Sequence, residues 1–366
     1  MMRLQAGASL RARKPQAVLP PSLLPDLAYT PEVARETAHL YERVSRVIPP
    51  IEWPGFAPYV KAINELKRAR NAVVLAHNYM TPEIFHCVAD VVGDSLQLAR
   101  EASKTNADVI VQGGVHFMAE TSKLLNPDKM VLIPDLRAGC SLAASITGAD
   151  VRALREAYPG VPVVTYVNTS AEVKAESDIC CTSANAVQVI DGLDTDKVLF
   201  VPDQYLGHYI STKTDKEMIL WPGYCPTHTK IQAEDIVARK GEYPGAKVIV
   251  HPECRPEVIA LADEVLGTGG MCRFAGQTDA NVIIVGTEVG IIHRLSKENP
   301  DKKFIAASLK AVCPNMKRIT AEKVLWALQD LAPEVRVAEP IRIRAKKAVD
   351  RMLQVGSVDK KTASLN

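Results

Sequence analysis

The chain has 366 residues, of which 47% are hydrophobic and 23% are charged, and its formal net charge at neutral pH is +2. This composition is typical of a soluble globular protein with room for two or three domains. The near-neutral charge argues against nucleic acid or an anionic membrane as a partner. No apolar run approaches the ~20 residues of a membrane span, and no secretory segment lies near the start. We therefore expect a cytoplasmic protein whose eight cysteines are reduced thiols.

Residues 1–57 are expected to form an N-terminal extension. Its first 25 residues contain several prolines, four basic side chains and no acid. This pattern fits an organellar presequence, although it is more typical of a disordered or surface-wrapping tail. A short helix is predicted at residues 32–44, and Pro49, Pro50 and Pro54 then precede the globular part.

From about Pro58 onward, short β-branched runs alternate with amphipathic helical patterns. Alternation of this kind, with continuously apolar strands, predicts an α/β fold with parallel sheets covered on both faces. The predicted strands are residues 72–76, 108–112, 130–133, 163–167, 197–201, 247–250, 281–285 and 303–307. The predicted helices are residues 82–92, 117–125, 151–157, 184–193, 256–262, 289–297 and 321–331.

The alternation repeats three times along the chain. Polar groups follow three of the strands, starting at His77, Tyr166 and His251, and a small polar turn lies 16 residues after each of them. Matching offsets predict a triplicated unit, with boundaries at 58–147, 148–233 and 234–320 and C-terminal helices and a tail at 321–366. Because ligands bind outside the carboxyl ends of parallel strands, we expect the three polar groups to line one central cavity.

Three cysteines, Cys140, Cys225 and Cys313, lie 85 and 88 residues apart, and each has Gly or Pro beside it, as in a loop. One thiol from each unit, meeting at a shared centre, favours an iron–sulfur cluster in which one iron stays open to substrate. A zinc site is the main alternative, although the short ligand pairs typical of structural zinc are absent from the sequence.

The strand-end groups carry side chains suited to acid–base chemistry and to substrate binding. His77 and His251 can bind carboxylates, Tyr79 offers a phenol for proton transfer, and Glu253 is a natural general base if burial tunes its pKa. Further candidates are a histidine beside the second cysteine, together with neutral donors and hydroxyls: His228, Ser95, Tyr166, Asn168, Ser183 and Thr268. No GxGxxG or Walker A motif is present, so no nicotinamide or flavin site is expected.

Together these motifs resemble the quinolinate synthase family. The matching stretches run from about residue 72 to residue 320 and include His77-Asn78-Tyr79, Gly93-Asp94-Ser95, Tyr166-Val167-Asn168, Cys181-Thr182-Ser183, His251-Pro252-Glu253-Cys254, Gly286-Thr287-Glu288, Met316-Lys317 and the three spaced cysteines. The resemblance implies three α/β/α units with short parallel sheets about a pseudo-threefold axis. It also implies a [4Fe–4S] cluster held by Cys140, Cys225 and Cys313.

The implied reaction condenses iminoaspartate with dihydroxyacetone phosphate to quinolinate, releasing phosphate and two waters, in de novo NAD biosynthesis. Tyr79 and Glu253 would be the acid–base pair, with His251 beside them. Substrate would be held by His77, Ser95, Tyr166, Asn168, Ser183, His228, His251, Glu253 and Thr268. A functional partner that supplies iminoaspartate is a further expectation, whereas nucleic acid and membrane are not expected as partners.

The chain departs from the family pattern at two places. Gly267-Thr268 stands where the family often has Ser-Thr, so one hydroxyl contact is expected to be replaced by a backbone amide or a water. The long N-terminal segment also lies outside the pattern and is given no role.

We expect the open iron to act as a Lewis acid while Tyr79 and Glu253 shuttle protons. Two alternatives remain open. One is an iron–sulfur redox or iron sensor without catalysis, against which the absence of a nucleic-acid-binding motif counts. The other is a different iron–sulfur hydro-lyase.

Overall fold

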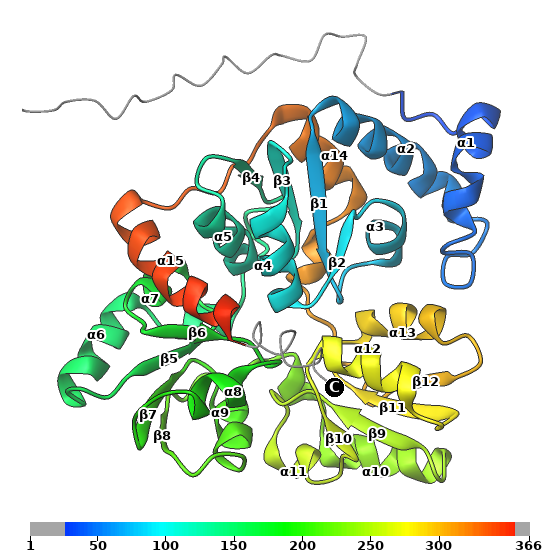
Figure 1. Ribbon diagram of the computed structural model, residues 1–366. Coiled ribbons are helices and arrows are strands. Elements are labelled where there is room, and N and C mark those ends of the chain that lie inside the picture. Colours follow the sequence, from blue (N-terminus) through cyan, green and yellow to red (C-terminus); the bar gives the residue numbers. More distant parts are fainter. Residues whose placement is uncertain (1–25, 356–366) are drawn as a thin grey trace, which may run out of the picture.

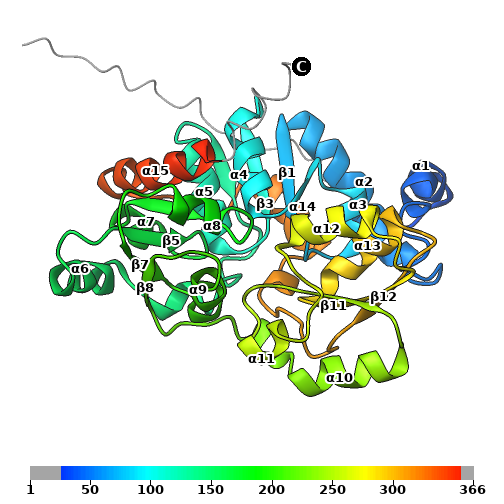
Figure 2. The ribbon, with the colours of Figure 1, turned by 60° about the horizontal axis from the view of Figure 1, so that its bottom comes forward.

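The computed structural model describes residues 26–355, and these residues contain three four-stranded parallel sheets arranged around a common centre (Figure 1). The strand orders are β2-β1-β3-β4, β6-β5-β7-β8 and β10-β9-β11-β12, so the three sheets share one topology. Helices surround each sheet, which confirms the predicted α/β fold of three similar units (Figure 2). Residues 1–25, where the tail was predicted, lie outside the described part.

The first unit contains β1 (Ala72–His77), β2 (Val91–Gly93), β3 (Val109–Gly113) and β4 (Met130–Leu132), with α3 (Pro82–Cys87), α4 (Ser95–Lys104) and α5 (His116–Leu125). The second contains β5 (Val163–Tyr166), β6 (Ile179–Cys181), β7 (Lys197–Val201) and β8 (Glu217–Leu220), with α6 (Gly148–Ala157), α7 (Ala171–Ala175), α8 (Ala186–Asp191) and α9 (Gln204–Ser211). The third contains β9 (Lys247–Val250), β10 (Glu264–Val265), β11 (Val282–Gly286) and β12 (Lys303–Ala306), with α10 (Ala233–Glu242), α11 (Pro256–Ile259), α12 (Thr268–Gln277) and α13 (Ile292–Glu298).

Two helices precede the first sheet and two follow the third: α1 (Pro31–Tyr41), α2 (Trp53–Ala69), α14 (Ala321–Asp330) and α15 (Glu339–Gln354). α14 returns to the first unit and packs against α2, and α15 packs against α7 and β6 (Figure 1). The C-terminal helices α14 and α15 therefore contact units that are distant from them in sequence. α2 runs across residue 58, where the first unit was expected to begin; the predicted domain boundaries stay predictions.

The predicted strands are close to those observed, but two helices were predicted too long. The expected helix at residues 82–92 ends at Cys87, and β2 follows it. The expected helix at residues 256–262 ends at Ile259, before β10. In both places the chain turns back within a few residues to add an edge strand, which local periodicity does not reveal.

One aspartate per unit repeats the same contact. Asp90, Asp178 and Asp263 each accept a hydrogen bond at 2.8 Å from the backbone amide of one of the first three residues of the first strand of their unit. Each aspartate directly precedes the edge strand of its unit and links it to the neighbouring strand. The repeated contact is direct structural evidence for the triplication. Within residues 26–355, no helix is long and apolar enough to cross a membrane.

Two histidines connect the first and third units. His86 of α3 lies 2.9 Å from His293 of α13, measured between His86 Nε2 and His293 Nδ1, and His293 Nε2 lies 2.8 Å from the carbonyl oxygen of Met80. His293 must carry its proton on Nε2 to donate a hydrogen bond to that carbonyl oxygen. His86 Nε2 therefore donates to His293 Nδ1. Burial lowers the pKa of His86 to about 3 and that of His293 to about 4, so both rings are neutral near pH 7.

We expect His293→Gln to weaken the dependence of stability on acid pH. In the unfolded chain a histidine takes up a proton below about pH 6.5, whereas these folded rings do so only near pH 4 and 3. Stability is therefore lost as the pH falls from about 6.5 towards 3. The parent urea midpoint should drop more than that of His293→Gln between pH 7 and pH 5. Exposed His208 gives the control, since His208→Gln should keep the parent drop; equal drops in the parent and His293→Gln would contradict the assignment.

Candidate active site

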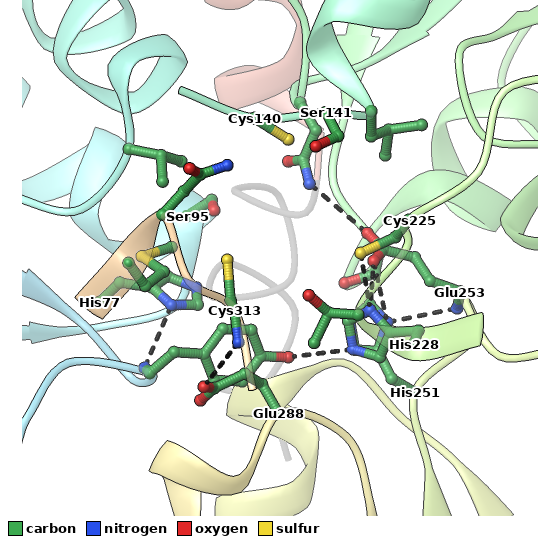
Figure 3. A pocket seen from close by; sticks show the side chains of 18 of the residues that line it. His77, Ser95, Cys140, Ser141, Cys225, His228, His251, Glu253, Glu288 and Cys313 are labelled. Atoms are coloured by element: carbon green, nitrogen blue, oxygen red, sulfur yellow. Dashed lines mark hydrogen bonds and ion pairs between the residues drawn. The ribbon is translucent and has the colours of Figure 1, made fainter. Parts of the chain in front are cut away.

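A cavity of about 170 Å³ lies where the three units meet. Its lining contains every side chain that the sequence singled out: His77, Tyr79, Ser95, Cys140, Tyr166, Asn168, Ser183, Cys225, His228, His251, Glu253, Thr268 and Cys313. Figure 3 shows that the labelled members come from all three units and surround one space. The structure thus brings these residues together, as expected from strand ends that share one centre.

The fold positions these groups by the ends of strands and the beginnings of helices. His77 ends β1, Tyr166 ends β5, and His251 directly follows β9. The hydroxyl residues Ser95 and Thr268 are the first residues of α4 and α12, which follow edge strands. Backbone amides at the start of these two ten-residue helices favour an anionic group nearby.

His77 and His251 have the same local geometry in their two units. The backbone amide of Tyr79 donates to His77 Nδ1 at 3.2 Å, and that of Glu253 donates to His251 Nδ1 at 3.2 Å. Burial lowers the pKa of each ring to about 3. Because Nδ1 accepts, each neutral ring carries its proton on Nε2. Both histidines are therefore neutral hydrogen-bond donors.

Glu253 is a buried carboxylate at the centre of a hydrogen-bond network. One oxygen lies 2.7 Å from His228 Nδ1, and the other lies 3.5 Å from the amide nitrogen of Asn168. The hydroxyl of Tyr166 also bonds to this carboxylate. Burial favours the neutral acid, but the nearby His228 and His251 and the hydrogen bonds from His228 and Tyr166 outweigh it and hold the pKa of Glu253 below its usual range. Glu253 is thus ionised, which is the form of a carboxylate that accepts a proton.

Tyr79 and Glu253, the predicted acid–base pair, are joined by a chain of hydrogen bonds. The Tyr79 hydroxyl lies 2.6 Å from Thr287 Oγ1, which lies 2.8 Å from His228 Nε2. The other nitrogen of His228 contacts Glu253. Burial raises the pKa of Tyr79 well above its usual value, so the phenol keeps its proton. Tyr79, Thr287, His228 and Glu253 can therefore pass a proton between a neutral phenol and an anionic carboxylate.

Each of the three spaced cysteines begins the same loop. Cys140, Cys225 and Cys313 lie three residues before the 3₁₀ turns η2 (Ala143–Ser145), η3 (His228–Lys230) and η5 (Met316–Arg318), whose first backbone amides donate to the sulfurs. Figure 3 shows the three sulfur atoms facing a common space. N–H groups bonded to sulfur and three converging thiols are the features expected of an iron–sulfur ligand set.

The thiols are neutral in the structure as described. Burial raises the pKa of Cys140 to about 12 and raises the pKa values of Cys225 and Cys313 as well. A cation is needed to stabilise them as thiolates, the form that binds metal. A smaller donor set overlaps this one, because ligand atoms of Cys225, His228 and Glu253 lie within 4.8 Å of one another. The donors therefore fit a cluster bound by three thiolates, and they also contain a possible site for a single ion.

Three residues in or near the pocket were not given a role by sequence reasoning, and one of them, Glu288, is part of its lining. Thr287 and Glu288 follow β11 directly, and Asp203 follows β7 with one intervening residue, Pro202. All three are buried polar side chains. They carry the signal that identified the other site residues, a polar group after a buried strand, but it was applied to the first strand of each unit only.

The departure at Gly267 has a structural counterpart. A Cβ atom at this position would lie 2.7 Å from Ser183 Oγ, so the hydroxyl of Ser183 faces the space that a side chain at position 267 would use. A serine side chain can rotate away from such a contact. The replacement of the missing hydroxyl contact by an amide or a water stays a prediction.

The fold and the pocket define an enzyme built from three repeated α/β units around a single buried acid–base site. The family model described as quinolinate synthetase A protein matches residues 61–354. A quinolinate synthase from Sinorhizobium fredii (strain NBRC 101917 / NGR234) is 54% identical over 331 residues, which cover 90% of this chain and 92% of that protein. One from Dehalococcoides mccartyi (strain CBDB1) is 59% identical over 293 residues, which cover 80% and 97% of the two chains. The chain therefore belongs to the quinolinate synthase family.

We expect Gly223→Ala to disturb the loop of Cys225. A Cβ atom there would collide with the carbonyl oxygen of Pro202 and the hydroxyl of Ser145, so backbone must move. The unfolding free energy should fall by about 1–3 kcal/mol, and bound iron per chain after anaerobic purification should fall with it. Gly139 is the matched control, because nothing lies within 4 Å of a Cβ atom beside Cys140. Equal iron content in Gly223→Ala and Gly139→Ala would be the contrary result.

Proposed function

We propose that this chain is a quinolinate synthase, which condenses iminoaspartate with dihydroxyacetone phosphate and releases quinolinate, phosphate and two waters. The observation that carries the proposal is the single pocket that holds three converging thiols and the Tyr79–Glu253 proton path. The reaction belongs to the de novo synthesis of NAD, and we place it in the cytoplasm. Because an imine hydrolyses in water, a functional partner that forms iminoaspartate is part of the proposal.

Cys140, Cys225 and Cys313 are the residues that would hold a [4Fe–4S] cluster. When bound by three thiolates, such a cluster supplies a Lewis-acidic iron at the fourth position. The protein residues have separate tasks around it. The three sulfurs face one space, so a substrate that reaches this space also reaches Tyr79 and Glu253 (Figure 3).

The condensation requires removal of protons from carbon or nitrogen and delivery of protons to leaving oxygens. Ionised Glu253 takes a proton, and the phenol of Tyr79 gives one. Thr287 and His228 return the proton from the carboxylate side to the phenol side between steps. The pair therefore needs no exchange with bulk water during the reaction.

Both proposed substrates are anions, and the pocket offers neutral donors and helix ends for them. His77 and His251 offer Nε2–H groups to a bound anion. Ser95 and Thr268 stand at the beginnings of α4 and α12. Tyr166, Asn168 and Ser183 add further polar groups. An adjoining pocket shares Asp94 and Ala184 with the cavity, and four cations, Arg100, Lys104, Arg273 and Arg294, outnumber the carboxylates of Asp94 and Glu101 in its lining. These cations favour the approach of anionic substrates.

The proposed cluster predicts a common phenotype for three variants. Cys140→Ala, Cys225→Ala and Cys313→Ala should each lose most of the iron and sulfide of the parent, because two thiolates leave the cluster under-ligated. The measurement is iron and sulfide analysis after anaerobic purification. Cys87→Ala is the control, since this buried thiol lies on α3 outside the pocket. Full iron retention by any of the three variants would remove that cysteine from the ligand set.

The proposed base predicts a different phenotype. Glu253→Gln should keep the iron and sulfide content of the parent but lower kcat by about 10²–10⁴-fold, because the amide cannot accept the proton. Quinolinate formation is measured anaerobically in both proteins. Near-parent turnover would exclude Glu253 as the base. A parent that binds iron but forms no quinolinate would favour the iron–sulfur sensor instead.

A further inference from the structure

Tyr79 is held at both ends by the third unit. Its hydroxyl bonds to Thr287, and its carbonyl oxygen accepts a hydrogen bond from Lys317 Nζ. Lys317 in turn forms an ion pair with Glu288, at 3.1 Å between Nζ and Oε1. The neighbouring residues Thr287 and Glu288 thus determine the position of the phenol and, through Lys317, that of the backbone that carries it.

Glu288 also determines the position of a cysteine loop. Its side chain is fully buried, and its oxygens accept hydrogen bonds from the backbone amides of Cys313 at 3.1 Å and Gly290 at 2.7 Å. Such a carboxylate is stabilised by its amide donors and by the ammonium group of Lys317. One buried side chain therefore joins the loop of a thiol to the loop of Tyr79.

Gly290 lies where the three partners meet. A Cβ atom there would be 2.6 Å from Glu288 Oε2, 2.6 Å from Lys317 Nζ and 2.7 Å from the carbonyl oxygen of Tyr79. The backbone of Gly290 has an ordinary negative φ, so the glycine is needed for space and not for conformation. The close packing leaves the lysine and the carboxylate little freedom to rearrange.

The other two units lack this arrangement. Val115, Asp203 and Glu288 are equivalent, because the residue after each donates its amide to the carbonyl oxygen two residues before the cysteine of its unit. Asp203 also accepts from the amide of Cys225, whereas Val115 has no polar group. The positions equivalent to Lys317, four residues after the cysteines, are Ala144 and Thr229. Of the three units, the third alone carries this lysine–glutamate pair next to Tyr79.

We propose that Glu288 and Lys317 are positioning residues that hold Tyr79 in place relative to the loop of Cys313. The proposal rests on the proposed function, in which Tyr79 gives a proton to a group bound near the thiols. A shift of about 1 Å in a catalytic group can cost about 100-fold in rate. Lys317 is a quarter exposed and is not part of the cavity lining, so its effect on the reaction passes through Tyr79.

The first test is a set of substitutions assayed for anaerobic quinolinate formation. Lys317→Met should lower kcat about 10- to 100-fold while iron and sulfide stay at the parent level, and Lys317→Arg should recover part of that loss. Gly290→Ala should resemble Lys317→Met, because it separates the same partners without a change of charge. Gly241→Ala is its control, since nothing lies within 4 Å of a Cβ atom there.

The second test asks whether Lys317 acts through Tyr79. In a double-mutant cycle, Lys317→Met should have little further effect on kcat in a Tyr79→Phe background. Additive losses would overturn the proposal, as would parent-level kcat in Lys317→Met. Loss of iron in step with activity would also overturn it, because Lys317 would then serve the thiol loop alone.

A third readout is independent of turnover. In the metal-free protein, Glu288→Gln and Lys317→Met should each lower the urea midpoint, and the double variant should fall little below the singles, because either change already breaks the pair. Additive drops would show that the two side chains do not act as a pair. If the parent forms no quinolinate, the proposed function fails, whereas an active parent with unaffected variants refutes only the positioning role.

Discussion

The buried negative charge of Glu253 is the constraint on which the site depends. A carboxylate removed from water must be compensated by nearby donors, and here these come from side chains distant in sequence. His228 and Asn168 reach it from the second unit, and His228 connects onward to the first unit through Thr287. The charge is therefore stable only when the three units are closed around it, which links the ionisation of the proposed base to the assembled fold.

The triplicated scaffold is regular where it builds sheets and irregular where it does chemistry. Asp90, Asp178 and Asp263 make one contact three times, and the three cysteine loops share one turn. Two residues beyond the first polar residue of each strand-end group, however, the units carry Tyr79, Asn168 and Glu253. A phenol, an amide and a carboxylate stand at one symmetric position, and in the proposed function they are an acid, a neutral donor and a base around one space. Symmetry supplies the geometry, and divergence at a few positions supplies the chemistry.

Much of this arrangement could be predicted from the sequence, because buried parallel strands appear in it as apolar runs followed by polar groups. The edge strands β2, β6, β8 and β10, of two to four residues each, were not predicted, although the equally short β4 was. α2 was also missed, because Pro54 lies in its first turn, where proline is tolerated, and Pro58 lies inside it. Thr287 and Glu288 do follow a buried strand, but their partners could not be predicted. Thr287 and Lys317 bond to Tyr79, more than 200 positions away, and Glu288 is connected to it through Lys317; no local pattern contains such a partner.

The neutral state of the three thiols constrains how a metal could be bound. Three thiolates without a cation would place like charges next to Glu253 in a buried pocket, so deprotonation and metal binding must occur together. A site of this kind is favoured by cysteine loops that are already in position, because neutral thiols exert no electrostatic force on one another that could arrange the loops. Backbone contacts hold the loop of Cys140, and the buried carboxylates of Asp203 and Glu288 hold those of Cys225 and Cys313. The fold therefore provides the geometry of the proposed ligand set, and a bound metal would provide the charge that completes it.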